Sequence, residues 1–335
     1  MRGLYSRRAA VAYACVFSTL AVATTHAGCS PDSGGEADAG PDRGGGIIPP
    51  PAPADAGSCD LTKPFGDPAI IPSVNLPDAE SGTLSADERT FYNMVKKDGW
   101  WHIYASKRQN VDGEFGPPQL FEGIRPKANL PEDFDPFLSF DGTEFFFSSI
   151  RTDSGPGTPG HFDIMVARRL SPDVPFDEPI GVGKINTTGI ERAPAPVANN
   201  SVLYFSSQAG ENAPARIYKS ARWGADFGAS EVVDLGPTPT DSSPLPDQSD
   251  LTLFFSSTRP GGQKDDIWVA RRQSVTEKFE PPTNTADVAA LNSAWNDAPR
   301  WLSADGCRIY LASDRPIPNG AEAGKFRMYV AKRPK

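Results

Sequence analysis

Histidine and cysteine are scarce in this sequence of 335 residues, which holds three His and four Cys. His26, His102 and His161 stand far apart, and no cluster of Cys and His has the spacing of a zinc site. So few histidines also leave no credible Ser-His-Asp combination for nucleophilic catalysis. No glycine-rich loop precedes a predicted helix, which excludes a phosphate-binding loop. We therefore expect no metal and no cofactor, with a calcium ion in a central channel as the open alternative.

Long apolar runs are also rare. The longest, Ala9 to Ala23, is too short for a confident membrane span. It follows Arg2, Arg7 and Arg8, and this combination of a basic start and a short apolar stretch predicts a signal peptide over residues 1–28.

The end of this predicted signal peptide, 27–29, resembles a bacterial lipobox, in which the cysteine is lipidated and becomes the first mature residue. The resemblance implies lipid attachment at Cys29, although His26 stands where the lipobox has Leu or a similar residue. Ordinary cleavage after Ala27 is the alternative. Residues 29–58 are rich in Gly, Pro, Ala and Asp, which predicts a disordered tether. We expect an exported protein, either an outer-membrane lipoprotein or one of the periplasm or cell surface.

Basic side chains are not concentrated anywhere in the chain. The net charge is −9, and no basic patch is interleaved with aromatic residues, so nucleic acid is not an expected partner. The 34 Pro and 31 Gly are too many for a helical protein, but they suit many short strands joined by turns.

A repeat is the main positive signal of the sequence. Each copy is a short strand that begins with an acid, a tight turn, and an apolar strand that ends in Ser-Ser or a variant of it. The clearest copies are 133–149, 191–207, 241–257 and 297–313, and a weaker one starts near Thr83. Each copy continues into another apolar run, at 103–107, 163–168, 217–221, 266–271 and 328–332. Spacings of 50 to 58 residues with several strands per unit predict a β-propeller.

The number of blades follows from an offset in the count. Five such triplets of strands are present, but only four outer strands follow them, because the sequence ends after the fifth triplet. A fifth outer segment, 65–75, precedes the first triplet. We expect an all-β, five-bladed propeller over residues 59–335, closed by pairing 65–75 beside 326–332, which hides both strand edges.

The cysteines outside the predicted signal and tether agree with this closure. Cys307 follows the turn of the last copy, and Cys59 shortly precedes the segment 65–75. In an antiparallel blade these two positions lie on the same face, so a Cys59–Cys307 disulfide is expected in an exported protein. Two unpaired thiols are the alternative.

The repeat resembles the WD40-like PD40 repeats of TolB-type propellers, most closely at 133–168, 241–271 and 297–332. That resemblance implies an envelope-associated protein that binds other proteins through its loops or central channel. We therefore expect a non-catalytic binding or scaffold module of the cell envelope, a lipid-anchored monomer whose partner is an envelope protein, peptidoglycan or a polysaccharide.

The alternative is an enzyme, a five-bladed glycoside hydrolase acting on polysaccharide, which needs carboxylates that converge in the central funnel. Four acids begin the inner strands and are candidates, but they recur once per repeat, which favours a hydrogen-bonding role at the strand end. Three arginines recur after the Ser-Ser pairs and share a face with these acids. The predicted ligand face consists of Asp133, Glu191, Asp241, Asp297, Arg151, Arg259 and Arg315.

Overall fold

The computed structural model describes residues 57–74, 80–97, 99–124, 132–150, 161–197, 199–210, 212–237, 240–317 and 324–335. The predicted signal peptide, the lipidation candidate Cys29 and almost all of the predicted tether lie outside these residues. Arg151 of the predicted ligand face also lies outside them.

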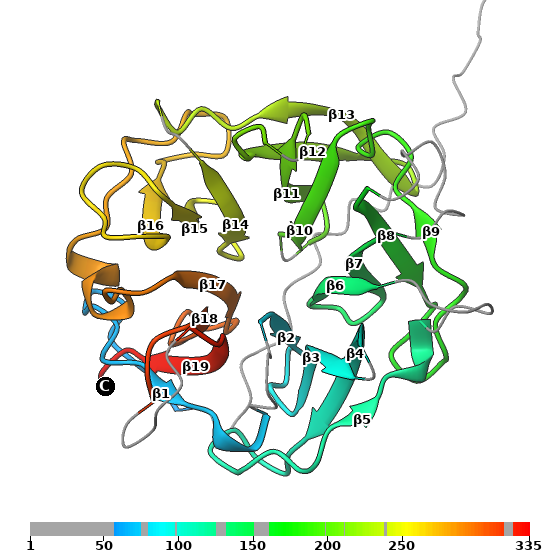
Figure 1. The fold of residues 1–335 in the computed structure, drawn as a ribbon, viewed down its shortest axis with the longest axis horizontal. Coiled ribbons are helices and arrows are strands. Elements are labelled where there is room, and N and C mark those ends of the chain that lie inside the picture. The colour runs from blue at the N-terminus through cyan, green and yellow to red at the C-terminus, as the bar shows by residue number, and fades with distance from the viewer. Residues whose placement is uncertain are drawn as a thin grey trace, which may run out of the picture. The chain divides into compact units, whose positions relative to one another are not determined.

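The strands form five antiparallel sheets around a central axis, so the predicted five-bladed propeller is confirmed (Figure 1). Strands β2, β6, β10, β14 and β17 are the innermost. In chain order the sheets are β2 (Gly82–Leu84), β3 (Thr90–Lys97), β4 (Trp100–Lys107) and β5 (Gln119–Leu120); β6 (Asp133–Leu138), β7 (Glu144–Ser149), β8 (Asp163–Arg168) and β9 (Ile180–Gly181); β10 (Ile190–Pro196), β11 (Val202–Gln208), β12 (Arg216–Trp223) and β13 (Asp226–Val232); β14 (Asp241–Pro246), β15 (Thr252–Ser257) and β16 (Asp266–Arg271); and β17 (Asp297–Leu302), β18 (Arg308–Ser313), β19 (Arg327–Lys332) and β1 (Ala69–Ile70).

The ring closes as the offset in the repeat predicts. Strand β1 pairs antiparallel with β19, with Ala69 opposite Val330 and Ile70 opposite Tyr329. The N-terminal segment therefore supplies the outer strand of the last blade, and Figure 1 shows β1 beside β19. The structure joins Cys59 to Cys307 by a disulfide with Cα atoms 5.7 Å apart, next to this closure.

The outer strands are shorter than the sequence predicts. Of the five outer segments, only that of the third blade forms a long strand, the seven-residue β13. In the other blades the ladder is two residues long, or a single bridge between Val269 and Thr283. Prolines within these segments have no N–H to donate, which limits the ladder. Short 3₁₀ helices η1 (Pro72–Val74), η2 (Glu122–Ile124) and η3 (Ala286–Leu291) follow three of them.

One contact recurs in all five blades and explains the phenylalanine that begins every outer segment. An arginine after the third strand places its guanidinium over that ring, 4.0 to 4.5 Å from the ring centre, in the pairs Arg108–Phe115, Arg169–Phe176, Arg222–Phe227, Arg272–Phe279 and Arg333–Phe65. The Nε of each arginine donates to the carbonyl of a turn residue with positive φ, namely Glu88, Gly142, Asn200, Asp250 and Gly306. The same guanidinium thus fixes the turn and the outer segment of its blade.

The second strand of each blade supplies the core between neighbouring blades. Phe145, Phe146 and Phe147 of β7 are all fully buried, and Phe146 packs in a different apolar cluster from its two neighbours. Because successive side chains of a strand point to opposite faces, this continuous apolar run fills both interfaces of the blade.

Candidate functional site

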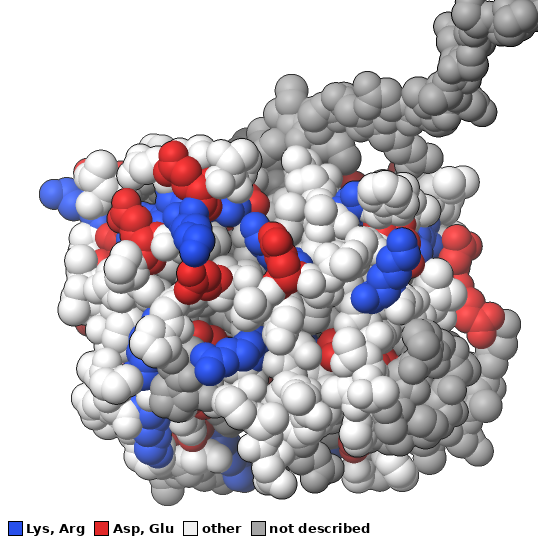
Figure 2. Space-filling model, turned by 90° about the horizontal axis from the view of Figure 1, so that it is seen from above, with Lys and Arg blue, Asp and Glu red and all other residues white. Residues whose placement is uncertain are grey.

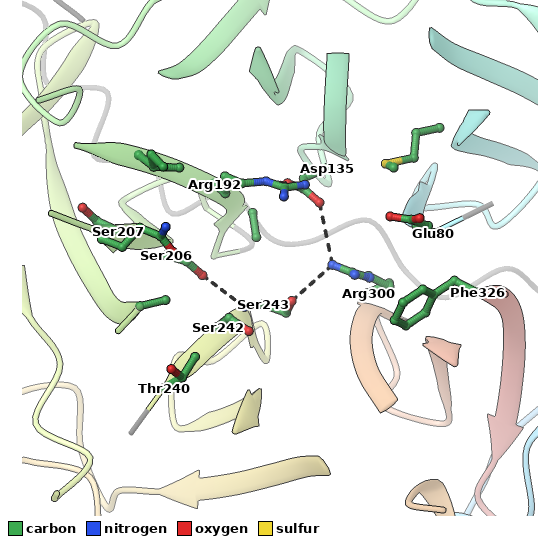
Figure 3. A pocket seen from close by; sticks show the side chains of 15 residues that line it. Glu80, Asp135, Arg192, Ser206, Ser207, Thr240, Ser242, Ser243, Arg300 and Phe326 are labelled. Carbon is green, nitrogen blue, oxygen red and sulfur yellow. Dashed lines mark hydrogen bonds and ion pairs between the residues drawn. The ribbon is translucent and has the colours of Figure 1, made fainter. Parts of the chain in front are cut away.

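A pocket of about 310 Å³ lies near the axis, where the inner strands of the blades begin. All five blades contribute to its lining, through residues such as Met94, Asp135, Arg192, Ser243 and Arg300. Figure 3 shows Asp135, Arg192, Ser243 and Arg300 converging from separate inner strands. We call this site the channel-mouth pocket.

The inner strands that form the channel-mouth pocket carry unusual backbone. Asp135, Ala193 and Ser243 have φ of 48°, 53° and 50°, and each stands at the same place in its blade, directly before a proline. The pairing with the second strand shifts register at each of these places, so each one is a β-bulge. A residue before proline normally adopts an extended conformation, and a left-handed non-glycine residue costs about 1–3 kcal/mol. Three such positions around one pocket mark it as a functional candidate.

Asp135 is the carboxylate at the centre of the pocket. Its Oδ2 accepts a hydrogen bond of 2.9 Å from Arg192 Nε and one of 3.3 Å from Ser148 Oγ, and its Oδ1 lies 3.8 Å from Arg300 Nη1. Burial alone would raise the pKa of Asp135, but the charges of Arg192 and Arg300 hold this pKa below its ordinary value. Asp135 is therefore an ionised group that organises the two arginines.

Arg192 is held from several sides. Its guanidinium lies 5.0 Å from the ring centre of Phe134 and 4.9 Å from that of Phe162, so both rings contribute cation–π attraction. Its side chain is nevertheless 38% exposed and lines the pocket. This arrangement presents a fixed cation to a ligand.

Arg300 comes from β17, opposite the strand that carries Arg192 in Figure 3. Its Nη1 donates to Ser243 Oγ over 3.2 Å, which ties the last blade to the bulge of the fourth. Its Nε is buried and has no hydrogen-bond partner among the described residues. Burial lowers the pKa of Arg300, opposed by the charge of Asp135.

The four acids of the predicted ligand face are buried instead. Each begins an inner strand and accepts hydrogen bonds from its own blade. The bonds are Ser149 Oγ to Asp133 at 2.8 Å, Ser207 Oγ and Thr187 Oγ1 to Glu191 at 2.9 and 2.7 Å, Arg259 Nη2 to Asp241 at 2.7 Å, and Ser293 Oγ and Arg315 Nη2 to Asp297 at 2.8 and 2.6 Å. Through these bonds each acid holds the start of the first strand of its blade against the end of the second strand.

The two described arginines of that predicted face bind two of these acids, Arg259 binding Asp241 and Arg315 binding Asp297. Arg259 also donates to the carbonyl of Leu235, and Arg315 to that of Leu291, so each one fixes the segment that leads into its blade. Arg259 is 8% exposed, and both of its terminal nitrogens have partners.

The predicted ligand face and the channel-mouth pocket consist of different residues. None of the six described members of the predicted ligand face lines the channel-mouth pocket. Their chain neighbours do, among them Ile190 and Arg192 beside Glu191, and Thr240 and Ser242 beside Asp241. Alternation along a strand turns neighbouring side chains to opposite sides, so the recurring acid points into the blade.

Sequence reasoning missed Asp135, Arg192 and Arg300. All three lie within the inner-strand repeat, at places where other copies have small or apolar residues such as Ala193, or Ala298 in the last blade. The signal that could have identified them is a charged residue at a repeat position that is uncharged in other copies. A residue that maintains the blade recurs in each copy, whereas a residue that contacts a ligand need occur only once.

Among the described residues, no group of three or more His, Cys, Asp or Glu side chains is placed to hold a metal ion. No helix in that same part of the chain is both long enough and apolar enough to cross a membrane.

Comparison with known proteins supports the fold of this chain but assigns it to no family. The sequence matches no family model and no curated protein. Among solved structures, a thermostable family-43 glycoside hydrolase is similar with a TM-score of 0.53 and 10% identity, over 78% of this chain and 91% of that one. The α-L-arabinofuranosidase PaAbf62A from Podospora anserina is similar with a TM-score of 0.46 and 9% identity, over 81% of this chain and 98% of that one.

The similar structures also include a protein whose name does not denote an enzyme. TolB from Acinetobacter baumannii is similar with a TM-score of 0.43 and 13% identity, over 76% of this chain and 55% of that one. This chain thus matches about half of that protein's length. At identities of 9 to 13%, these likenesses concern the fold alone, and they do not distinguish binding from hydrolysis.

Proposed function

We propose that this protein is a non-catalytic binding module of the bacterial cell envelope, exported and lipid-anchored at Cys29, which takes its partner at the channel-mouth pocket. The state of Asp135 carries the proposal. A glycoside hydrolase needs a carboxylic acid whose pKa is raised, so that it can protonate the leaving group. The pKa of Asp135 is lowered instead, and two arginines occupy this carboxylate.

The rest of the pocket supports binding. Arg192 lies against two aromatic rings that contact each other, and the left-handed residues Asp135, Ala193 and Ser243 hold the inner strands in a strained conformation. A site that is already rigid loses little conformational freedom when a ligand binds.

The partner is an envelope protein, peptidoglycan or a polysaccharide, and the protein acts as a monomer. On the side of the disc that Figure 2 shows, acidic and basic side chains are mixed. Such a mixed surface offers no field of one sign to a nucleic acid, which is in keeping with the composition.

Capture of the partner tests the proposal. The mature chain is used as bait against the solubilised envelope of its own host, against peptidoglycan and on a glycan array. Gln208, which lines the pocket and is partly exposed, is changed to Trp to obstruct it. Lys278→Gln, on a side chain that is 83% exposed and outside the pocket, is the control. We expect the partner to be lost with Gln208→Trp and kept with Lys278→Gln; retention by both variants would refute binding at this pocket.

Hydrolysis of a polysaccharide is the second candidate, because the fold is shared with a family-43 hydrolase and two carboxylates, Glu80 and Asp135, line the same pocket. Incubation with arabinofuranosides, xylo-oligosaccharides and cello-oligosaccharides tests it. Turnover by the wild type that disappears in both Glu80→Gln and Asp135→Asn would establish the enzyme and overturn the binding proposal.

A further inference from the structure

The channel-mouth pocket holds two arginines whose hydrogen-bonding capacity is only partly used. Arg192 commits Nε to Asp135, and among the described residues none accepts a hydrogen bond from its two terminal nitrogens. Arg300 commits Nη1 to Ser243 and leaves a buried Nε without an acceptor. The buried Nε of Arg300 is closed to a ligand as it is to solvent, so the donors that a ligand can reach are the terminal nitrogens of Arg192 and Nη2 of Arg300, to which no described residue offers an acceptor.

A carboxylate is the acceptor that best fits two planar guanidinium groups. Arginine presents its donors as a rigid fork that matches both oxygens of a carboxylate. Asp135 is one carboxylate shared by two arginines, and Figure 3 shows Arg192 and Arg300 on either side of it. A second carboxylate would give each guanidinium a partner of its own.

Two carboxylates in the pocket oppose an anion, namely Asp135, which is already paired with both arginines, and Glu80. Glu80 lines the same pocket, and its negative charge acts on Arg300 and supports the charged form of that arginine. The same negative charge must repel an incoming carboxylate. This opposition supplies a test with a defined sign, because removing the charge of Glu80 must strengthen the binding of an anion.

The remaining lining favours a sugar over a peptide. Neutral groups of Ser207, Gln208, Thr240 and Ser242 match the hydroxyls of a sugar, and Phe326 adds an apolar ring. A peptide would bind most readily as an added strand, but β-bulges interrupt three of the inner strands beside the pocket. The volume of about 310 Å³ is at the small end of ligand sites, which suits one or two sugar units.

We infer that the channel-mouth pocket binds a uronic acid unit of an acidic polysaccharide, with Arg192 and Arg300 holding the sugar carboxylate. The inference rests on the proposed binding function and specifies its ligand. The sugar is bound without a covalent step, and the neutral side chains around the arginines hold its hydroxyls.

Direct binding of defined sugars tests the inference. The mature wild-type chain is titrated by calorimetry with glucuronate and galacturonate, as single sugars and as disaccharides, and with glucose, galactose and their disaccharides as neutral counterparts. We expect the uronates to bind about 10- to 100-fold more tightly than the neutral sugars, the range of a charge-assisted hydrogen-bonded pair.

Variants of the pocket give effects of opposite sign. Arg192→Lys and Arg300→Lys keep the charge but lose the fork, so uronate binding should weaken about 10-fold or more. Glu80→Gln should tighten uronate binding severalfold relative to the binding of the neutral sugars. Lys278→Gln removes a cation far from the pocket and should change nothing. Thermal melting of each variant verifies folding, and Glu80→Gln keeps the test decisive if an arginine variant fails to fold.

Several results would overturn the inference. Equal binding of neutral sugars would remove the role of the carboxylate, and absence of any uronate binding would remove the ligand. Preferential binding of a peptide with a free terminal carboxylate would assign the arginines to a protein partner. If uronates fail while Gln208→Trp still abolishes capture of the envelope partner, the inference fails and the proposed function stands. Cleavage of the sugars would instead refute the proposed function.

Discussion

The closure of the propeller by Cys59–Cys307 is open to a quantitative test. The disulfide joins residues separated by 248 positions, so it encloses nearly the whole propeller. Without it, the last blade keeps its N-terminal strand through a ladder of only two residue pairs, Ala69–Val330 and Ile70–Tyr329, and through neighbouring contacts. Reduction therefore removes the disulfide that links the two ends of the ring.

The magnitude follows from the length of the enclosed loop. In the chain-entropy account, a cross-link over this separation restricts the unfolded chain by about 5.5 kcal/mol at 25 °C. With an unfolding entropy of roughly 2.1 cal/mol/K per residue over roughly 275 residues, this difference corresponds to a shift in Tm of about 10 °C. Measured disulfide contributions often fall below the chain-entropy value, so the shift is an upper bound.

Calorimetric melting of the mature chain, with and without a phosphine reductant, measures this shift. A Cys59→Ser, Cys307→Ala double variant is the control, because it should melt near the reduced wild type and be insensitive to the reductant. Reduced and oxidised wild type that melt within about 2 °C of each other would refute the reasoning, since the closure would then be maintained by non-covalent contacts alone.

Three further perturbations have defined outcomes. Arg333→Met removes the contact over Phe65, so it should destabilise the propeller by about 1–2 kcal/mol in urea unfolding and expose the N-terminal segment to protease. Arg169→Met makes the same change in a blade whose four strands are consecutive in the sequence, and it should destabilise the propeller equally without exposing that segment. The pKa of Asp135 in the folded protein lies below its ordinary 3.8, so the ionised carboxylate stabilises the protein above about pH 4, and this contribution is lost as the pH falls through the folded pKa. In urea unfolding, Asp135→Asn should therefore lower the free energy of unfolding more at pH 6 than at pH 3. An equal loss at the two pH values would contradict this. Glu88 is a buried carboxylate that accepts hydrogen bonds from Nε and Nη2 of Arg308, and Arg308 also pairs with Asp305; Glu88→Ala removes the buried half of this network and should cost about 3 kcal/mol in the same assay, and a loss below about 1 kcal/mol would argue against the importance of the Glu88–Arg308 pair.

The turns between the first and second strands show how far a sequence pattern reaches. An Asp-Gly pair predicts a left-handed residue at Gly142 and Gly306, and the structure has φ of 71° and 70° there. Glu88, Asn200 and Asp250 adopt the same conformation without being glycine. The pattern identifies the turn only where glycine marks it, but the arginine that binds each turn carbonyl enforces one geometry in all five blades.

The sequence by itself determined the number of blades, their strand order and the offset that closes the ring. These properties follow from local patterns that recur along the chain, and every blade repeats the same packing on its neighbours. Only the tertiary structure decided that the recurring acids turn into the blades and that Asp135, Arg192 and Arg300 meet at the channel mouth. Those three residues come from three different blades, and their approach depends on the bulges and on the closed ring, which no short stretch of sequence records.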